Sequence, residues 1–189
     1  TVAFACSLPA VAAGNILQVS SQVTCQDKRV PIGVVVSIVP FNFPLMVPMW
    51  TFPIALVMGN TVVLKPSEKV PLTMQRTVQL LKEAGLPPGC LNLVQGDKRA
   101  VQALLAHDAV NVVTFVGSSP VAEFIHTSCA NKRCLALGGP RNHLIALADC
   151  DIDSTAQDVV VSCCGCAGQR CMAASVILLI GHQDVLLEK

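Results

Sequence analysis

A cysteine with a cation beside it, close to a glycine, is the strongest candidate for covalent chemistry in this sequence. The segment from 167 to 172 reads AGQRCM, so Arg170 directly precedes Cys171. A neighbouring guanidinium stabilises a thiolate, which is the nucleophilic form of cysteine. We therefore predict that Cys171 is the most reactive of the ten thiols and acts as a nucleophile.

Three further cysteines lie just before this segment, at Cys163, Cys164 and Cys166. A metal cluster is one interpretation, but the C-C-x-C spacing does not match the C-x₂₋₄-C pairs typical of zinc sites. We expect no metal and predict that these cysteines are small core residues of a buried helix. The ten cysteines show no disulfide framework, which favours a reducing compartment.

Polar residues also follow several apolar, β-branched runs. Asn42 lies in PFNFP at 40–44, where its amide could donate a hydrogen bond to a developing oxyanion. The alternative is a turn asparagine that bonds its own backbone. Lys65 and Glu68 come directly after Thr61–Leu64, and Ser118 follows Val112–Val116.

Each of these strand-end motifs has a functional and an ordinary interpretation. A cation and a carboxylate at a strand's carboxyl end can bind an adenosine ribose, and a helix N-terminus after Ser118 can bind a phosphate. The ordinary alternatives are a solvated turn and a helix cap. Because parallel strands end at one edge, we predict that Lys65, Glu68 and Ser118 face the same crevice.

The elements that must position these residues alternate between strands and helices, which predicts an α/β fold with a Rossmann-like parallel sheet and flanking helices. The expected strands are Val34–Val39, Thr61–Leu64, Leu91–Val94, Val112–Val116, Cys134–Leu137, His143–Leu147 and Ser175–Ile180. The expected helices are Met46–Met58, Leu72–Ala84, 97–107 with Asp97 as its cap, one capped by Ser118, and one from Asp151 or Asp153 towards Gly168.

Composition agrees with a well-buried sheet: 52% of the 189 residues are hydrophobic and 13% are charged. The net charge of +1, without a basic run, gives no sign of nucleic-acid binding. Residues 30–64 carry no charge, but five prolines interrupt them, so we predict buried strand, loop and helix instead of a membrane span.

Taken in order, the motifs resemble those of the aldehyde dehydrogenase superfamily. The resemblance is carried by PFNFP at 40–44, KPSE at 65–68, FVGSS at 115–119, LGG at 137–139 and GQRC at 168–171. GNT at 59–61, RNH at 141–143 and GQRCMA at 168–173 are similar to the CoA-acylating branch that oxidises methylmalonate semialdehyde. The resemblance implies an NAD-binding domain over 1–137 and the beginning of the catalytic domain over 138–189.

The resemblance also implies roles for particular residues. It assigns the NAD site to Val39, Phe41, Lys65, Glu68, Lys69 and Ser118. Asn42 and the backbone N–H of Cys171 form the oxyanion hole, and Arg170 holds a substrate carboxylate. Lys69 stands where the family has arginine, which puts one contact to the cofactor in doubt.

The implied reaction oxidises methylmalonate or malonate semialdehyde with NAD through a Cys171 thioester. CoA takes the acyl group, and loss of carbon dioxide gives propionyl-CoA or acetyl-CoA. Ala136 occupies the position of the glutamate that activates water in most hydrolytic relatives, which favours CoA. The alternatives are a hydrolytic NAD-dependent aldehyde dehydrogenase and an inactive fragment or pseudoenzyme that binds nucleotide.

Relatives are longer at both ends, so the chain is expected to be a segment of such an enzyme and inactive alone. The resemblance implies a homotetramer or homodimer for the complete protein. It implies the mitochondrial matrix in a eukaryote or the cytoplasm in a bacterium, and neither a membrane nor nucleic acid as a partner.

Overall fold

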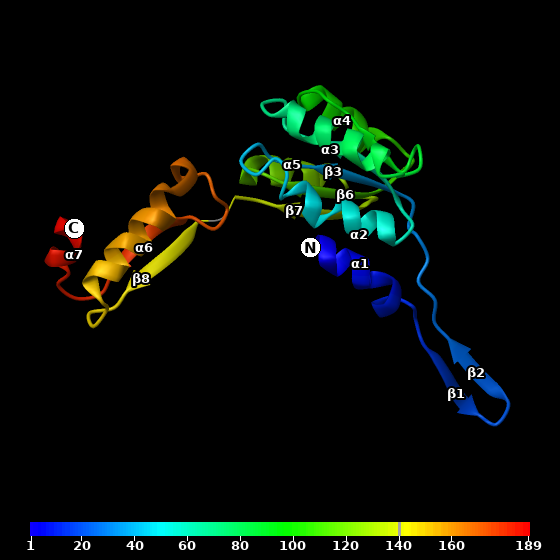
Figure 1. Ribbon diagram of the computed structural model, residues 1–189, viewed down its shortest axis with the longest axis horizontal. Helices are drawn as coiled ribbons and strands as arrows, with labels where there is room; N and C mark the ends of the chain where they lie inside the picture. The colour runs from blue at the N-terminus through cyan, green and yellow to red at the C-terminus, as the bar shows by residue number, and fades with distance from the viewer. Residues whose placement is uncertain (140) are drawn as a thin grey trace. The chain divides into compact units, whose positions relative to one another are not determined.

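The chain forms two compact units, residues 1–138 and residues 139–189 (Figure 1). A computed structural model describes residues 1–139 and 141–189. None of the helices in these described ranges is both long and apolar enough to cross a bilayer. The two units are called unit 1 and unit 2 below.

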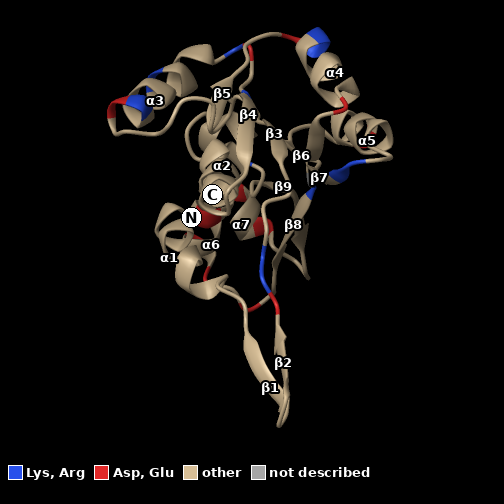
Figure 2. Cartoon of the chain, turned by 90° about the vertical axis from the view of Figure 1, so that its right-hand side faces the viewer, with Lys and Arg blue, Asp and Glu red and all other residues tan. Residues whose placement is uncertain are grey.

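Unit 1 is built around a five-stranded sheet in the order β5-β4-β3-β6-β7, in which all neighbouring strands are parallel. The strands are β3 (Val34–Ile38), β4 (Thr61–Lys65), β5 (Leu91–Leu93), β6 (Val110–Val116) and β7 (Arg133–Leu137). In Figure 2 the strands of this sheet are largely uncharged, and the charged residues gather on helices and loops. The predicted Rossmann-like parallel sheet is confirmed.

Helices cover both faces of this sheet because successive residues of each strand point to opposite sides. Val36 packs in a core with α4 (Lys98–Ala106) and α5 (Ser119–Ser128). The preceding residue, Val35, packs in a second core with α2 (Phe52–Val57) and α3 (Pro71–Glu83). The sheet is therefore buried on both sides, and its strands read as apolar runs.

The predicted single helix over Met46–Met58 is wrong. The structure has a short 3₁₀ helix, η1 (Pro48–Trp50), followed by α2. Pro48 and Pro53 each lie in the first turn of one of these helices. A proline has no backbone N–H and fits best in the first turn of a helix, so these two prolines favour a division of the apolar run into two helices.

The first 26 residues form α1 (Val2–Val11), which packs against α2, and an antiparallel hairpin of β1 (Ile16–Ser20) and β2 (Val23–Gln26). Sequence reasoning missed this hairpin. All residues of both hairpin strands are exposed, so the short polar–apolar alternation in LQVS and VTCQ does not correspond to a half-buried face.

Unit 2 contains a two-stranded parallel sheet, β8 (Asn142–Ala146) and β9 (Ala174–Leu179). Both strands were predicted, but their pairing in a separate sheet was not. Between these strands lie α6 (Ile152–Cys164) and the 3₁₀ helix η2 (Gly165–Gly168), and α7 (Asp184–Glu188) follows β9. Asp151 caps α6, because its carboxylate accepts a hydrogen bond of 2.8 Å from the Ser154 backbone N–H.

Candidate active site

A cavity of about 590 Å³ lies at the carboxyl ends of three strands of unit 1. Its lining includes Val39 after β3, Lys65 at the end of β4 and Ser118 after β6. After β3 the chain continues to β4 and β5 on one side of the sheet, and after β6 it continues to β7 on the other side. Ligands of open parallel sheets bind where the strand order switches in this way. The prediction that Lys65, Glu68 and Ser118 face one crevice is confirmed.

All six residues that the family resemblance assigns to cofactor binding line this cavity: Val39, Phe41, Lys65, Glu68, Lys69 and Ser118. Sequence reasoning missed several other lining residues, among them Lys98, Val101, Phe115, Pro120, Val121 and Phe124. The parallel topology could have indicated these residues indirectly. The N-terminal ends of α4 and α5 lie at the same edge of the sheet as the carboxyl ends of the strands that precede them.

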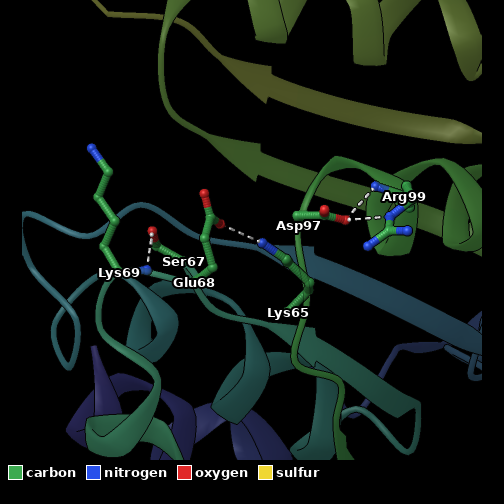
Figure 3. A network of polar contacts seen from close by, with 6 residues as sticks. All are labelled: Lys65, Ser67, Glu68, Lys69, Asp97 and Arg99. Atoms are coloured by element: carbon green, nitrogen blue, oxygen red, sulfur yellow. Dashed lines mark hydrogen bonds and ion pairs between the residues drawn. The ribbon is translucent and has the colours of Figure 1, made fainter.

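An ion pair between a buried lysine and an exposed glutamate lies within the cavity (Figure 3). The Lys65 ammonium is 5% exposed and donates a hydrogen bond of 3.1 Å to the Glu68 carboxylate, which is 56% exposed. Two hydrogen bonds hold the pKa of the Glu68 carboxyl below its ordinary value. The larger effect comes from the Glu68 backbone N–H and the smaller from the Lys65 ammonium. Glu68 therefore presents a charged acceptor at the opening, where it suits a sugar hydroxyl.

Two further lysines flank this pair and lie over aromatic rings. The Lys69 ammonium is 4.6 Å from the centre of the Phe41 ring, and the Lys98 ammonium is 5.9 Å from that of Phe124. Figure 3 shows the Lys69 side chain directed away from the Lys65 ammonium. With three lysines and one glutamate in its lining, the cavity attracts an anionic ligand that also has a flat apolar part.

Ser118 begins α5 at the edge of the cavity. It occupies the predicted N-cap position, and its carbonyl accepts a 2.9 Å hydrogen bond from the Ala122 N–H. The prediction that its side chain caps the helix is wrong, since no such bond occurs in the described part of the chain. Glycine precedes it, and a Cβ on Gly117 would lie 2.4 Å from the Phe115 ring, so a larger residue there would require the ring to move.

Asn42 follows Phe41 in a bend of unit 1 and is partly buried. Cys171 lies in unit 2, in the turn between η2 and β9, and is also partly buried. Their assignment to one oxyanion hole stays a prediction, in which each unit supplies one donor.

Hydrogen bonds from distant segments hold the Cys171 turn. The Asn142 amide donates to the Cys171 carbonyl at 2.8 Å and to the Ala173 carbonyl at 3.1 Å. The Ala174 backbone N–H donates to the Ser162 hydroxyl at 3.1 Å. The turn is thereby joined to β8 on one side and to α6 on the other.

The backbone before this turn is strained. Cys166 and Ala167 have left-handed φ angles of 55° and 53°, and Gly168 has a φ of 69°. Residues other than glycine adopt this conformation at a cost of about 1–3 kcal/mol. The chain reverses sharply here, so the geometry of the following turn depends on the bonds that hold it.

The prediction that the three neighbouring cysteines are buried is wrong for this structure. Cys163 is half-buried and donates its thiol hydrogen to the Ala174 carbonyl at 3.0 Å, while Cys164 and Cys166 are exposed. Within unit 2, α6 packs against β9, η2 and α7 and has no buried residue. The apolar composition of this helix suggested a core, but two strands are too small a sheet to bury it.

Among the described residues, no group of three or more His, Cys, Asp or Glu could hold a metal ion.

Arg170 is exposed, and its guanidinium lies against the backbone of Gly165. A Cβ at Gly165 would be 2.8 Å from Cζ of Arg170. The glycine thus leaves room for the cation beside the Cys171 turn.

The aldehyde dehydrogenase family model matches residues 1–186 of the chain. Malonate-semialdehyde dehydrogenase 1 of Geobacillus kaustophilus is 42% identical over the whole chain, and malonate-semialdehyde dehydrogenase 2 of Bacillus mycoides is 48% identical over 97% of it. The chain spans 39% and 38% of the lengths of these relatives.

Solved structures are similar over nearly the whole chain. The methylmalonate-semialdehyde dehydrogenase DddC of Oceanimonas doudoroffii has a TM-score of 0.94 and 45% identity. A putative methylmalonate-semialdehyde dehydrogenase of Sinorhizobium meliloti, complexed with NAD, has a TM-score of 0.95 and 39% identity. In both comparisons the match covers 98% of this chain and 39% of the other.

Proposed function

Because this chain belongs to the aldehyde dehydrogenase family, we propose that it supplies the NAD site and the nucleophile of a CoA-acylating enzyme for malonate or methylmalonate semialdehyde. In this proposal unit 1 is the NAD-binding domain and unit 2 begins the catalytic domain. The observation that carries the proposal is that all six predicted cofactor residues line one cavity of unit 1.

The charged and apolar lining residues of the cavity suit the adenosine end of NAD. Lys65 donates a hydrogen bond to a ribose hydroxyl and Glu68 accepts one, as expected at the end of a Rossmann strand. The N-terminus of α5 after Ser118 favours a phosphate. The apolar residues Val39 and Phe41 provide a surface for a ring. NAD, when bound, supplies the hydride acceptor of the reaction.

The residues of unit 2 carry the covalent chemistry. The Cys171 thiolate attacks the aldehyde carbon, and a carbon–sulfur bond forms as the carbonyl π electrons move to oxygen. The Asn42 amide and the Cys171 N–H donate hydrogen bonds to that oxygen. Loss of a hydride from the same carbon leaves a Cys171 thioester. Arg170 pairs with the carboxylate at the other end of the substrate.

CoA then attacks the thioester carbon with its thiol, and the Cys171 thiolate leaves. The substrate carboxylate departs as carbon dioxide, and a proton takes its place on the carbon. Ala136 favours this route over hydrolysis: it lies in β7, packs against the first core of unit 1 and offers no carboxylate to activate water.

The deciding experiment uses the complete protein to which this sequence belongs. Purified protein is incubated with NAD and malonate or methylmalonate semialdehyde, with and without CoA, and NADH is measured at 340 nm. We expect turnover that requires CoA and yields the acyl-CoA. Equal turnover without CoA, with a free acid as product, would identify a hydrolytic enzyme instead.

Arg170 provides a second test of the substrate class. In Arg170→Ala, KM for malonate semialdehyde should rise about tenfold or more, since a charge-assisted pair is lost. KM for propionaldehyde, which has no carboxylate, should stay within about twofold of the wild-type value. An equal rise of KM for both aldehydes would show that Arg170 does not bind the carboxylate.

The relatives named above are bacterial, so we propose the cytoplasmic alternative. From the resemblance to the family we also propose a homo-oligomer.

A further inference from the structure

We infer that Asn142 is a positioning residue for the Cys171 nucleophile, an inference that rests on the function proposed above. Asn142 is the first residue of β8, and its side-chain nitrogen donates to two carbonyls that lie 29 and 31 positions later in the chain. One of these carbonyls belongs to Cys171 itself.

The position of Asn142 in the sheet explains why a side chain is needed there. Asn142 pairs with Ala174, whereas the next residue, His143, pairs with Val176, so the register shifts by one residue at the start of the sheet. Ser175 is the extra residue of this irregularity. A register shift disturbs the regular exchange of backbone hydrogen bonds, and the Asn142 amide extends the link between β8 and the segment before β9.

The chemistry of the contact favours an amide over related side chains. A primary amide has two N–H donors on one nitrogen, so it can bond both carbonyls at once. A carboxylate at this position would direct an acceptor towards two carbonyl acceptors and repel them. A hydroxyl has a single hydrogen to donate and could satisfy one carbonyl.

The other supports of the turn act at a different residue. Ser162 and Cys163 of α6 both bond Ala174, three residues beyond the nucleophile. On the N-terminal side, the left-handed residues Cys166 and Ala167 make the backbone costly to hold in place. Asn142 therefore contributes what these supports do not: it fixes the peptide unit that begins at the Cys171 carbonyl.

The orientation of that peptide unit matters for the reaction. Fixing the Cys171 carbonyl restricts the backbone rotation that also sets the direction of the Cys171 thiol and N–H. Misplacement of reacting groups by about 1 Å can lower a rate by about 100-fold. Loss of the Asn142 amide should therefore lower kcat and change the environment of the thiol.

The test compares Asn142→Ala and Asn142→Asp with Ser162→Ala in the complete protein. Ser162→Ala is the matched control, because it removes a hydrogen bond from the same turn without touching Cys171. Steady-state kinetics give kcat and KM. The pH dependence of iodoacetamide labelling at Cys171, followed by mass spectrometry without NAD or CoA, reports the thiol independently of turnover. Thermal unfolding measures the loss of stability in all three variants.

We expect both Asn142 variants to lower kcat by about 10- to 100-fold and to change the rate and pH midpoint of Cys171 labelling. Ser162→Ala should change kcat by less than about threefold at a comparable shift of Tm. The inference is overturned if Asn142→Ala keeps the wild-type kcat and labelling profile, or if both sites lower kcat equally with the profile unchanged. Full activity in Cys171→Ser would instead refute the proposed function.

Discussion

The cavity of unit 1 and the Cys171 turn of unit 2 are held in place by different means. Lys65 is buried at the end of a strand whose neighbouring residue, Leu64, is completely buried in an apolar core. The Cys171 turn follows a helix without a buried residue, and its carbonyls are bonded by a distant side chain. A binding cavity at strand ends is thus positioned by core packing, whereas the candidate nucleophile is positioned by a few directional hydrogen bonds.

The largest expected effect separates chemistry in one unit from binding in the other. Cys171→Ser should lower NADH formation by the complete protein by about 1,000-fold or more, because the hydroxyl is a far weaker nucleophile than a thiolate. The Kd for NAD, measured by calorimetric titration, should change by less than about twofold. Cys166→Ser serves as the control and should retain most of the activity. Similar losses of activity in both variants would show that Cys171 is not the specific nucleophile.

The second prediction tests the binding side of the comparison. Lys65→Ala should raise the Kd for NAD by about 10- to 100-fold, since a hydrogen bond to a charged group contributes about 1.5–3 kcal/mol. Lys82→Ala is the control, because Lys82 lies exposed on α3 outside the cavity lining. Fluorescence or calorimetric titration gives both constants. Equal affinities in the two variants would exclude Lys65 from the NAD site.

The third prediction concerns the choice between two nucleotides within the same cavity. Glu68 should make NAD bind more tightly than NADP, because its carboxylate accepts from a ribose 2′-hydroxyl and repels a 2′-phosphate. The lowered pKa keeps this carboxyl charged at neutral pH. Glu68→Gln should lower the ratio of the Kd for NADP to the Kd for NAD by about tenfold. Glu83→Gln on α3 should leave this ratio unchanged. A wild-type preference for NADP would reverse the assigned role of Glu68, with Lys69 as the dominant charge.

The two regions also differ in how far they could be predicted from the sequence. The parallel sheet followed from β-branched runs such as Val34–Ile38, and the common edge of Lys65 and Ser118 followed from parallel topology. Topology thus predicted the edge at which the cavity lies, and the family resemblance supplied six of its lining residues, whose roles stay proposals. Lys98 was missed because it lies on a helix surface, where no periodic pattern marks a binding residue.

The surroundings of Cys171 were less predictable, for a physical reason. Apolar cysteines in α6 suggested burial, but exposure depends on how much sheet the helix can cover, which a local pattern does not contain. The bonds from Asn142 join residues that are 29 and 31 positions apart. Nor does the sequence of η2 indicate left-handed backbone at Cys166 and Ala167.

The smallest expected effect concerns a thiol of unit 1 that contrasts with the exposed thiols of unit 2. Cys129 ends α5 and is 3% exposed. Burial, followed by the neighbouring Cys134 thiol, raises the pKa of Cys129 from its ordinary value of 9.0 to about 11. Between these values the folded chain binds more protons than the unfolded chain. The free energy of unfolding should therefore fall as pH rises from about 9 to 11.

Unfolding in urea, followed by fluorescence, tests this sign in unit 1, because the single tryptophan, Trp50, packs against its second core. Between pH 8 and pH 10 the wild-type free energy of unfolding should decline, and Cys129→Ala should flatten the decline. Cys25→Ala, at an exposed thiol of the same unit, should keep the wild-type slope. At pH 8 iodoacetamide should label Cys164 and Cys166 faster than Cys129, since exposed thiols ionise and meet the reagent more readily. Two results would contradict this prediction: Cys129 reacting as fast as Cys164, or Cys129→Ala leaving the pH dependence of the free energy of unfolding unchanged. Either result would show that burial in unit 1 does not protect the Cys129 thiol from ionisation.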